Sequence, residues 1–397
     1  MTCVLRFEKY WTVTVVDQVS FNPVDVNFRH GAESFKLRAE ISKLMNMFDE
    51  AGALEIQLPS LIDSGVLIDL YGEDIRNRAY TTANPMGEKK ILRPDFTVPI
   101  VQMHIVTDKT YGKYSYSGPV WRSQPQGSKK PSEYFQVGLE YFHETDSSTA
   151  DAEVFELFQR CTSGLDIDIE LGDMGIIRAI VNCLDISENK RRLLLRHLWR
   201  PVRFKQLLEQ LSMDNSISGP RATLFQAIKN DAVIDYVEAN GPVIGQRSVD
   251  DIIIRSKELL KEELKKPISQ AVVSMIEKIQ QLKCSLSSAP SKLSDFLSLG
   301  EDLGVVKENL EGRIQAMAEI GIEIDKLNFA TNLSRTSLEY YDGFIFSISI
   351  KGSPHVPPLA QGGRYNALTK ILGKGANIPA VGGIIRPEIL LSQRLGR

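Results

Sequence analysis

The feature that most restricts the fold is a pair of strand-like segments, KYSYSGPVW (113–121) and SEYFQVGLEYFH (132–143). Apolar and polar residues alternate in both segments, which is the period of a β-strand with one buried face. The residues between them are rich in Gln, Pro, Gly, Ser and Lys, a composition typical of a turn. The pair therefore predicts a long antiparallel hairpin, and with it a sheet.

Further strands are expected on both sides of a long helical stretch. They are expected at 53–63, around the turn NPMGE (84–88), and at 166–173, 327–333, 339–350 and 379–385. From about 174 to 320 the pattern is helical almost throughout. This order predicts an α+β fold, in which an antiparallel sheet is flanked by helices and carries a mainly helical insertion.

Apolar spacing places several helices of this fold. One is expected over 34–51, ended by Gly52, with Phe35, Ile41, Leu44, Met45 and Phe48 on its buried face. Other helices are expected after Pro99, at about 149–162, at 364–372 behind a pair of glycines, and at the C-terminal end.

Composition and spacing exclude several classes of protein. The net charge of −3 provides no general basic field for nucleic acid, and the basic segment 189–205 is more typical of a solvated helix face or a protein contact. The four cysteines are far apart, and the five histidines have no metal-ligand spacing. No apolar stretch could span a bilayer, and charged residues precede any apolar run at the N-terminus. We therefore expect a cytoplasmic protein that binds no metal, cofactor or membrane, and we do not expect nucleic-acid binding.

Polar residues on extended segments indicate a small-molecule site. In LRPDFT (92–97) and FQVGLE (135–140), polar residues two or four positions apart share one side of the chain. Acids and a hydroxyl can receive an ammonium group, and paired tyrosines could line a small side chain or an imidazole. Each motif alone also fits an ordinary strand face. The candidates are Asp95, Thr97, Gln136, Glu140, Tyr340 and Tyr341.

A second set of candidates is basic. Arg122 stands where the first arm of the hairpin ends, where a guanidinium can hold a phosphate or carboxylate with two hydrogen bonds. Lys129 and Lys130 lie in the connecting loop, which could fold over an anion. On the hairpin alone, a solvated surface turn is the more ordinary interpretation.

Taken together, these motifs resemble the catalytic core of class II aminoacyl-tRNA synthetases, and of histidyl-tRNA synthetases in particular. The matching segments are GALEIQLPSLID, LRPDFT, GPVWRSQPQGSKKPSEYFQVGLE, LEYYDG, GGRYNAL and PAVGGIIRPEILL. The resemblance implies a synthetase-like core at 1–180 and 321–397 with a helical insertion at 181–320. It also implies a homodimer that pairs near 53–63, histidine bound by the first candidate set, and a nucleotide site at Arg122, Lys129 and Lys130.

This sequence differs from the family mainly at positions where the family has charged side chains. In the third motif Glu388 aligns with the family's glutamate, but Ile389 stands at the arginine that clamps the distal phosphate of ATP. Thr336 stands at the activating arginine, with Arg335 displaced by one residue. Gln124 replaces an acid, and Lys129-Lys130 replaces a Gly-Arg pair. The anticodon-binding domain is expected to be absent, since the chain ends at Arg397.

Retention of the amino-acid positions with loss of the phosphate clamp resembles a paralogous family, the regulatory subunits of short-form ATP phosphoribosyltransferase. That resemblance implies a chain that is not an enzyme by itself. It would associate with a small catalytic subunit, which it activates for the first step of histidine biosynthesis, and it would confer feedback inhibition by histidine. Two alternatives stay open at this point: a free-standing amino-acid-adenylating enzyme, and a module that senses uncharged tRNA.

Overall fold

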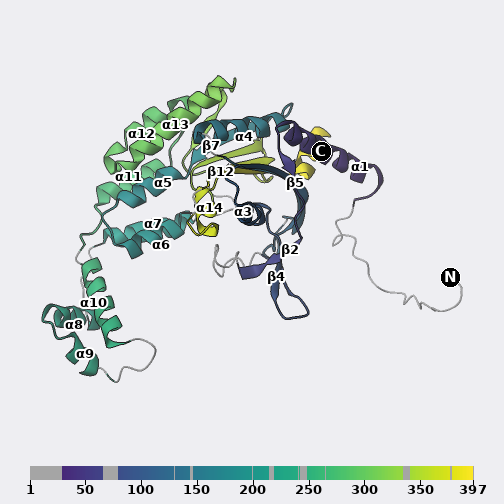
Figure 1. Cartoon of the computed structure of the whole chain (residues 1–397). Helices are drawn as coiled ribbons and strands as arrows, with labels where there is room; N and C mark the ends of the chain where they lie inside the picture. The colour runs from purple at the N-terminus through teal and green to yellow at the C-terminus, as the bar shows by residue number, and fades with distance from the viewer. Residues whose placement is uncertain are drawn as a thin grey trace, which may run out of the picture.

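The computed structural model describes residues 29–65, 79–128, 130–143, 146–198, 200–213, 219–239, 241, 248–263, 265–333, 340–375 and 378–396. Its centre is a nine-stranded sheet in the order β1-β5-β6-β12-β11-β10-β7-β9-β8, with helices packed around it (Figure 1). The expected α+β class is confirmed by this arrangement. The strands are β1 (Leu54–Glu55), β5 (Gly112–Trp121), β6 (Glu133–Phe142), β7 (Ile167–Asp173), β8 (Lys283–Ser285), β9 (Asn328–Ala330), β10 (Phe344–Ile350), β11 (Ala360–Arg364) and β12 (Ala380–Ile385).

The predicted hairpin is confirmed as β5 and β6, the longest antiparallel pair of the sheet. Its register places Tyr116 opposite Gly138 and Gly118 opposite Gln136. On its other edge, β6 pairs with β12, where Gly382 lies opposite Glu140. Because directly opposed residues of antiparallel strands point to the same face, this register decides which side chains can meet over the sheet.

A small second sheet lies beside the main one and consists of β2 (Leu61–Asp63), β4 (Lys89–Leu92) and β3 (Thr81–Ala83). The turn NPMGE between β3 and β4 is closed by a hydrogen bond from Asn84 N–H to the carbonyl of Glu88. The hairpin predicted there is confirmed. The segment 53–63, expected as one strand, contains two short strands in different sheets, β1 and β2.

Helices α1 (Gly31–Glu50), α4 (Ser147–Cys161), α5 (Gly175–Cys183), α13 (Asp302–Glu319) and α15 (Pro387–Arg394) surround the main sheet. The predicted buried face of α1 is wrong at Phe35, which is 65% exposed, whereas Leu37, Leu44 and Phe48 are buried. Phe35 lies two positions before Leu37, and about 100° per residue therefore turns it to the opposite side of the helix.

Another helix, α3 (Thr97–Val106), starts two residues before the predicted position. Pro99 lies in its first turn, where the missing N–H would have no partner within the helix. The last elements of the fold, α14 (Asn366–Leu372), β12 and α15, follow the predicted order.

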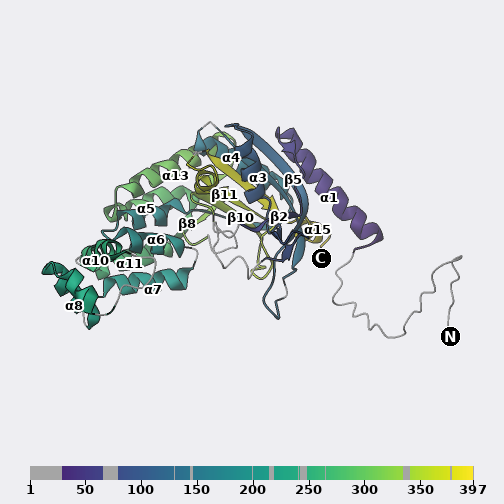
Figure 2. The ribbon, with the colours of Figure 1, turned by 60° about the horizontal axis from the view of Figure 1, so that its bottom comes forward.

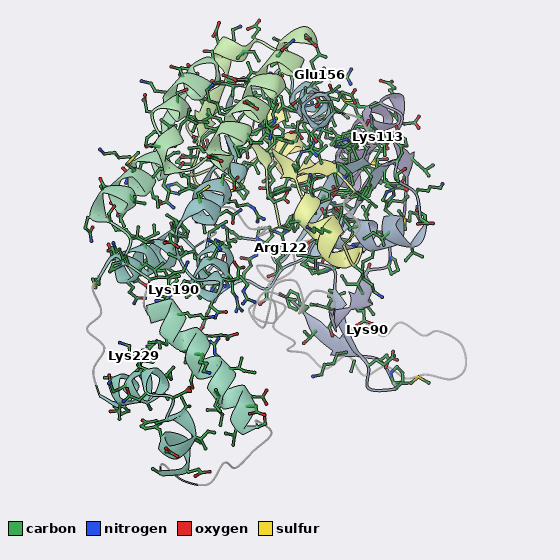
Figure 3. The ribbon with its side chains drawn as sticks, turned by 60° about the vertical axis from the view of Figure 1, so that its left-hand side comes forward. Lys90, Lys113, Arg122, Glu156, Lys190 and Lys229 are labelled. Atoms are coloured by element: carbon green, nitrogen blue, oxygen red, sulfur yellow. The ribbon has the colours of Figure 1, made fainter. Side chains whose placement is uncertain are left out.

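The middle of the chain forms the helices α6 (Glu188–Arg196), α7 (Pro201–Ser212), α8 (Pro220–Lys229), α9 (Val233–Ala239), α10 (Val249–Glu263), α11 (Gln270–Gln280) and α12 (Ala289–Ser294), with short 3₁₀ turns at Leu286–Ser288, Leu297–Leu299 and Ile324–Lys326. Helices α8–α10 form an outlying group around Phe225, Ile228 and Val233, away from the main sheet (Figures 1 and 2). Figure 3 locates this group by Lys229.

Two predictions of local structure are corrected. The helical stretch expected over 174–320 contains the strand β8, which pairs with β9 in the main sheet. Residues 360–364, expected as a loop and the opening of a helix, form the strand β11. Both are short, and three to five residues carry too little periodicity to distinguish a strand from its surroundings. The boundaries of a separate insertion at 181 and 320 stay a prediction.

No helix within the described ranges is both long and apolar enough to cross a membrane. The same residues contain no group of three or more His, Cys, Asp or Glu side chains arranged to hold a metal ion.

Candidate ligand-binding site

A cluster of buried polar side chains surrounds Glu140, near the C-terminal end of β6. The hydroxyl groups of Thr97 and Tyr116 donate hydrogen bonds of 2.6 and 3.1 Å to Glu140 Oε1. Tyr365 OH donates to the other oxygen, Oε2, at 2.5 Å. Tyr340 OH donates in turn to Thr97 Oγ1 at 3.0 Å. We call these five residues the Glu140 cluster.

The environment of Glu140 changes its acidity. Only 1% of the residue is exposed, and burial raises the pKa of Glu140 to about 7, against the opposing effect of three hydroxyl donors. The free energy of placing a charge in an apolar interior therefore outweighs the hydrogen bonds that stabilise the carboxylate. A carboxyl group with this pKa can take up or release a proton near neutral pH, which suits a partner such as imidazole.

Asp95 is a second buried acid, located just before α3. Its Oδ1 accepts a hydrogen bond of 3.2 Å from Val98 N–H. Burial raises the pKa of Asp95, and the positive charge of Arg122 opposes this effect. The two acids also repel each other when both are ionised, and the charge of Asp95 is one cause of the raised pKa of Glu140. The site can therefore accept positive charge from a ligand.

Gln136 lies on the same face of β6 as Glu140 and is 1% exposed. Neither its Oε1 nor its Nε2 has a hydrogen-bond partner. A buried polar group without a partner costs about 1–3 kcal/mol. Gln136 therefore offers one donor and one acceptor to a ligand.

Arg122 approaches the site from the end of β5. Its Nε donates to the carbonyl of Pro94 at 2.9 Å, whereas its buried Nη2 has no partner. Tyr341 is buried beside Tyr340, with the two rings 4.9 Å apart. Burial, together with the charge of Glu140, raises the pKa of Tyr341, so its hydroxyl stays protonated.

The structure thus brings together all six residues proposed for the small-molecule site: Asp95, Thr97, Gln136, Glu140, Tyr340 and Tyr341. Of the basic candidates, Arg122 is at the site. Lys130 is exposed, and its backbone N–H donates to Ser128 Oγ. Lys129, Arg335 and Thr336 lie outside the described residues.

Two members of the cluster were not among the candidates. Tyr116 is on β5 opposite Gly138. It could be recognised as part of the site only from the register between β5 and β6. Tyr365 follows β11, in the segment expected to open a helix. Three glycines on neighbouring strands leave room for side chains of the site. At Gly138 a β-carbon would overlap Tyr116, at Gly382 it would overlap Glu140, and at Gly363 it would overlap the backbone oxygen of Phe344 and press on Tyr341.

The third motif contributes Glu388 and Arg386. Glu388 accepts hydrogen bonds from Phe135 N–H and Arg29, each at 3.1 Å. Arg386 is buried and donates to the carbonyl of Pro358 at 2.5 Å and to Gln361 Oε1 at 3.2 Å. Ile389, at the position of the family's phosphate clamp, is partly buried against the hydrophobic core. That position therefore supplies no charge.

Substitution of Gly382 by alanine is expected to disrupt the Glu140 cluster. The new β-carbon would overlap Glu140 Oε2 and lie 2.6 Å from the backbone oxygen of Leu139. We expect a loss of about 1–3 kcal/mol in the free energy of unfolding, measured by urea denaturation. As a control, Gly304→Ala in α13 meets no atom within 4 Å and should be neutral or slightly stabilising. Equal stability of the two variants would contradict this packing.

Known proteins with the same architecture were found by sequence and by structure. A model of the family described as histidyl-tRNA synthetase matches residues 26–240 and 253–390. An ATP phosphoribosyltransferase regulatory subunit of Allorhizobium ampelinum is 28% identical over 85% of this chain and 93% of its own length. The protein with the same name from Agrobacterium fabrum is 28% identical over 86% of this chain and 92% of its own.

Solved structures agree on the fold. A Bacillus halodurans structure described as an ATP phosphoribosyltransferase regulatory subunit/histidyl-tRNA synthetase has a TM-score of 0.65 at 17% identity, covering 93% of this chain and 81% of that one. A histidine–tRNA ligase subunit from Alicyclobacillus acidocaldarius has a TM-score of 0.59 at 19% identity, covering 96% and 99%. On the strength of the family match, the chain belongs to the histidyl-tRNA synthetase family, and the two curated relatives described above are named ATP phosphoribosyltransferase regulatory subunits.

Proposed function

We propose that this chain is the regulatory subunit of an ATP phosphoribosyltransferase, that it activates a small catalytic subunit, and that it transmits feedback inhibition by histidine. The names of the relatives support the first part of this proposal. The observation that carries the rest is the Glu140 cluster, a buried set of acids, hydroxyls and aromatic rings.

Free histidine fits the chemistry of this cluster. Its imidazole has a pKa of about 6.5, close to the value of about 7 for Glu140, so the two groups can share a proton in an ion pair. Tyr340 and Tyr341 are placed to pack on a small ring. Asp95 and the free Oε1 of Gln136 would take the ammonium group. Because every member of the cluster is buried, entry of histidine would exchange some of the present hydrogen bonds for bonds to the ligand.

We infer that the chain does not activate amino acids itself. Formation of an aminoacyl-adenylate requires preorganised positive charge around phosphorus, and removal of one such donor costs about 10²–10³ in rate. Ile389 is an apolar residue packed on the core, and it cannot replace the arginine of the family's third motif. Retained Arg122, with Lys129 and Lys130, would then form a vestigial nucleotide site.

Amino-acid-dependent exchange of pyrophosphate into ATP tests this inference. We expect no histidine-dependent exchange above background with the isolated chain at neutral pH. Ile389→Arg, which restores the family's residue, provides a variant in which a gain could be detected. Exchange by the unmodified chain at a rate typical of synthetases would instead support a free-standing adenylating enzyme.

Pairing into a homodimer is part of the same proposal. The edge strand β1 leaves Leu54 64% exposed, and Leu61 in the adjoining segment is also exposed. An unpaired strand edge with apolar side chains is a surface that another chain can cover. Sedimentation of the isolated chain as a monomer at micromolar concentration would contradict this part.

A further inference from the structure

We propose that Arg386 and Arg122 together bind the carboxylate of the ligand, so that the site recognises a free amino acid and rejects one whose carboxylate is blocked. This inference rests on the proposed binding of histidine at the Glu140 cluster. It adds a residue, Arg386, that stands outside the candidate sets derived from the sequence.

The two arginines reach the site from opposite sides of β6. In the sheet, β6 lies between β5 and β12. Ile385 is paired with Val137, so the next residue, Arg386, continues alongside Gln136 in an extended conformation. Residue 122 extends β5 by one position, and its N–H donates to the carbonyl of Ser132 at 2.7 Å. Alternate residues of β5, counted from Tyr116, lie on the same face of the sheet as the Glu140 cluster. Continued to residue 122, this alternation places Arg122 on that face.

The two guanidinium groups are close enough for their charges to interact. The Arg122 guanidinium lies over Tyr134, with its carbon 5.8 Å from the ring centre. Burial lowers the pKa of Arg386 to about 10, and the charges of Tyr134 and Arg122 also act on it, the latter lowering the pKa further. Two positive groups are therefore held near each other beside Gln136.

Neither arginine donates a hydrogen bond to a carboxylate among the residues that the structure describes, although the charge of Asp95 acts on Arg122 and the charge of Glu388 acts on Arg386. The hydrogen bonds of Arg386 go to two neutral oxygens, those of Pro358 and Gln361. Arg122 has one bond to a neutral carbonyl and a buried Nη2 without a partner. The nearest acid of the third motif, Glu388, already accepts from Arg29 and Phe135. Because buried charges in proteins are normally paired, the arrangement favours an anion supplied by a ligand.

An α-amino acid has the charge distribution that this site requires. Glu140 lies four residues beyond Gln136 on the same face of β6, Asp95 lies near Arg122, and Arg386 continues β12 beside Gln136. The free Oε1 and Nε2 of Gln136 can accept from the ammonium group and donate to the carboxylate. A guanidinium can bind a carboxylate through two parallel hydrogen bonds. The carboxylate would thus neutralise Arg122 and Arg386 while the ammonium group neutralises Asp95.

Calorimetry with L-histidine and L-histidinamide tests this assignment on the full chain. The two ligands share the imidazole and ammonium groups, and the amide removes only the negative charge. We expect histidine to bind at least ~10²-fold more tightly, because two buried positive groups would otherwise face a neutral amide. Arg386→Gln should lower the affinity for histidine to within a few fold of that for histidinamide, and Arg122→Gln provides a second variant if the first fails to fold. Arg203→Gln, on the exposed face of α7, should retain the discrimination.

Each outcome decides one claim. Equal binding of histidine and histidinamide would overturn this inference and leave the proposed function intact. Competition between AMP and histidine that disappears in Arg386→Gln would assign the pair of arginines to a phosphate and would also overturn it. Failure of the unmodified chain to bind histidine at all would overturn the proposed function, and this inference with it.

Discussion

Glu140→Gln is expected to weaken histidine binding by roughly 10²-fold or more, since it removes the only charge that an imidazolium would meet inside the cluster. The amide keeps the shape of the side chain, and its oxygen can still accept from Thr97 and Tyr116. The loss should therefore appear in calorimetric affinity and not in the fold. Glu133→Gln, at the exposed start of the same strand, is the matched control and should bind histidine like the unmodified chain.

The affinity for histidine is also expected to depend on pH. Above pH 7, Glu140 is ionised and free histidine is neutral, so forming the ion pair requires uptake of a proton and affinity should fall as pH rises. Below about pH 6 both groups are protonated, and binding requires release of a proton. Affinity should thus be highest between about pH 6 and 7. A profile that is unchanged in Glu140→Gln would show that histidine binds elsewhere.

The raised pKa of Glu140 also affects stability. An unfolded glutamate ionises near pH 4.5, whereas burial raises the pKa of folded Glu140 to about 7. The stabilising contribution of protonated Glu140 is therefore complete below pH 4.5 and is lost as pH rises from 4.5 to 7. Above pH 7 this group changes the free energy of unfolding no further. In Glu140→Gln this loss is absent, so the variant should unfold at a higher urea concentration than the unmodified chain at pH 8.

Asp151→Ala is expected to cost about 3–5 kcal/mol in the free energy of unfolding, because it removes the carboxylate to which buried Arg364 donates and one of the two to which buried Arg313 donates. Arg313 Nε donates to Asp151 Oδ2 at 2.8 Å, and Arg364 Nη2 donates to Asp151 Oδ1 at 2.7 Å. Arg313 also donates to Asp173 at 2.9 Å. The network joins α13, α4, β7 and β11, and Arg364 directly precedes Tyr365 of the Glu140 cluster.

The matched control is Glu156→Ala, on the outer face of the same helix (Figure 3). Glu156 forms an exposed pair with Arg160 at 3.6 Å, and such pairs contribute about 0.3–0.5 kcal/mol. Urea denaturation of the two variants should therefore differ by several kcal/mol. An equally small effect for Asp151→Ala would mean that the buried network does not stabilise the fold.

The sequence predicts the parts of this molecule that depend on local periodicity. The hairpin β5–β6 and the shared face of Gln136 and Glu140 follow from alternation along a strand, and the turn at 84–88 follows from its Asn, Pro and Gly residues. Elements that depend on distant partners were not predictable in this way. The strand β8 is held by pairing with β9, and Phe35 was misplaced because neighbouring surfaces determine which side of α1 is covered.

Long-range contacts explain why the candidate site was only partly predicted. Tyr365 and Glu140 are 225 positions apart, and Arg364 and Asp151 are 213 apart. Arg364 stood beside Tyr365 in one motif, yet the two side chains serve different clusters, one in the ionic network and one at Glu140. Arg386 could be related to Gln136 only through the pairing of β12 with β6.

The most direct test combines this chain with a small catalytic ATP phosphoribosyltransferase subunit and measures the transfer of the phosphoribosyl group to ATP, with and without histidine. Addition of the chain is predicted to raise turnover severalfold or more. Histidine should then suppress the gain with the unmodified chain and fail to do so with Glu140→Gln. Because coupling between sites is reciprocal, ligands of the catalytic subunit should also change the affinity for histidine. Turnover that responds neither to the chain nor to histidine would contradict the account.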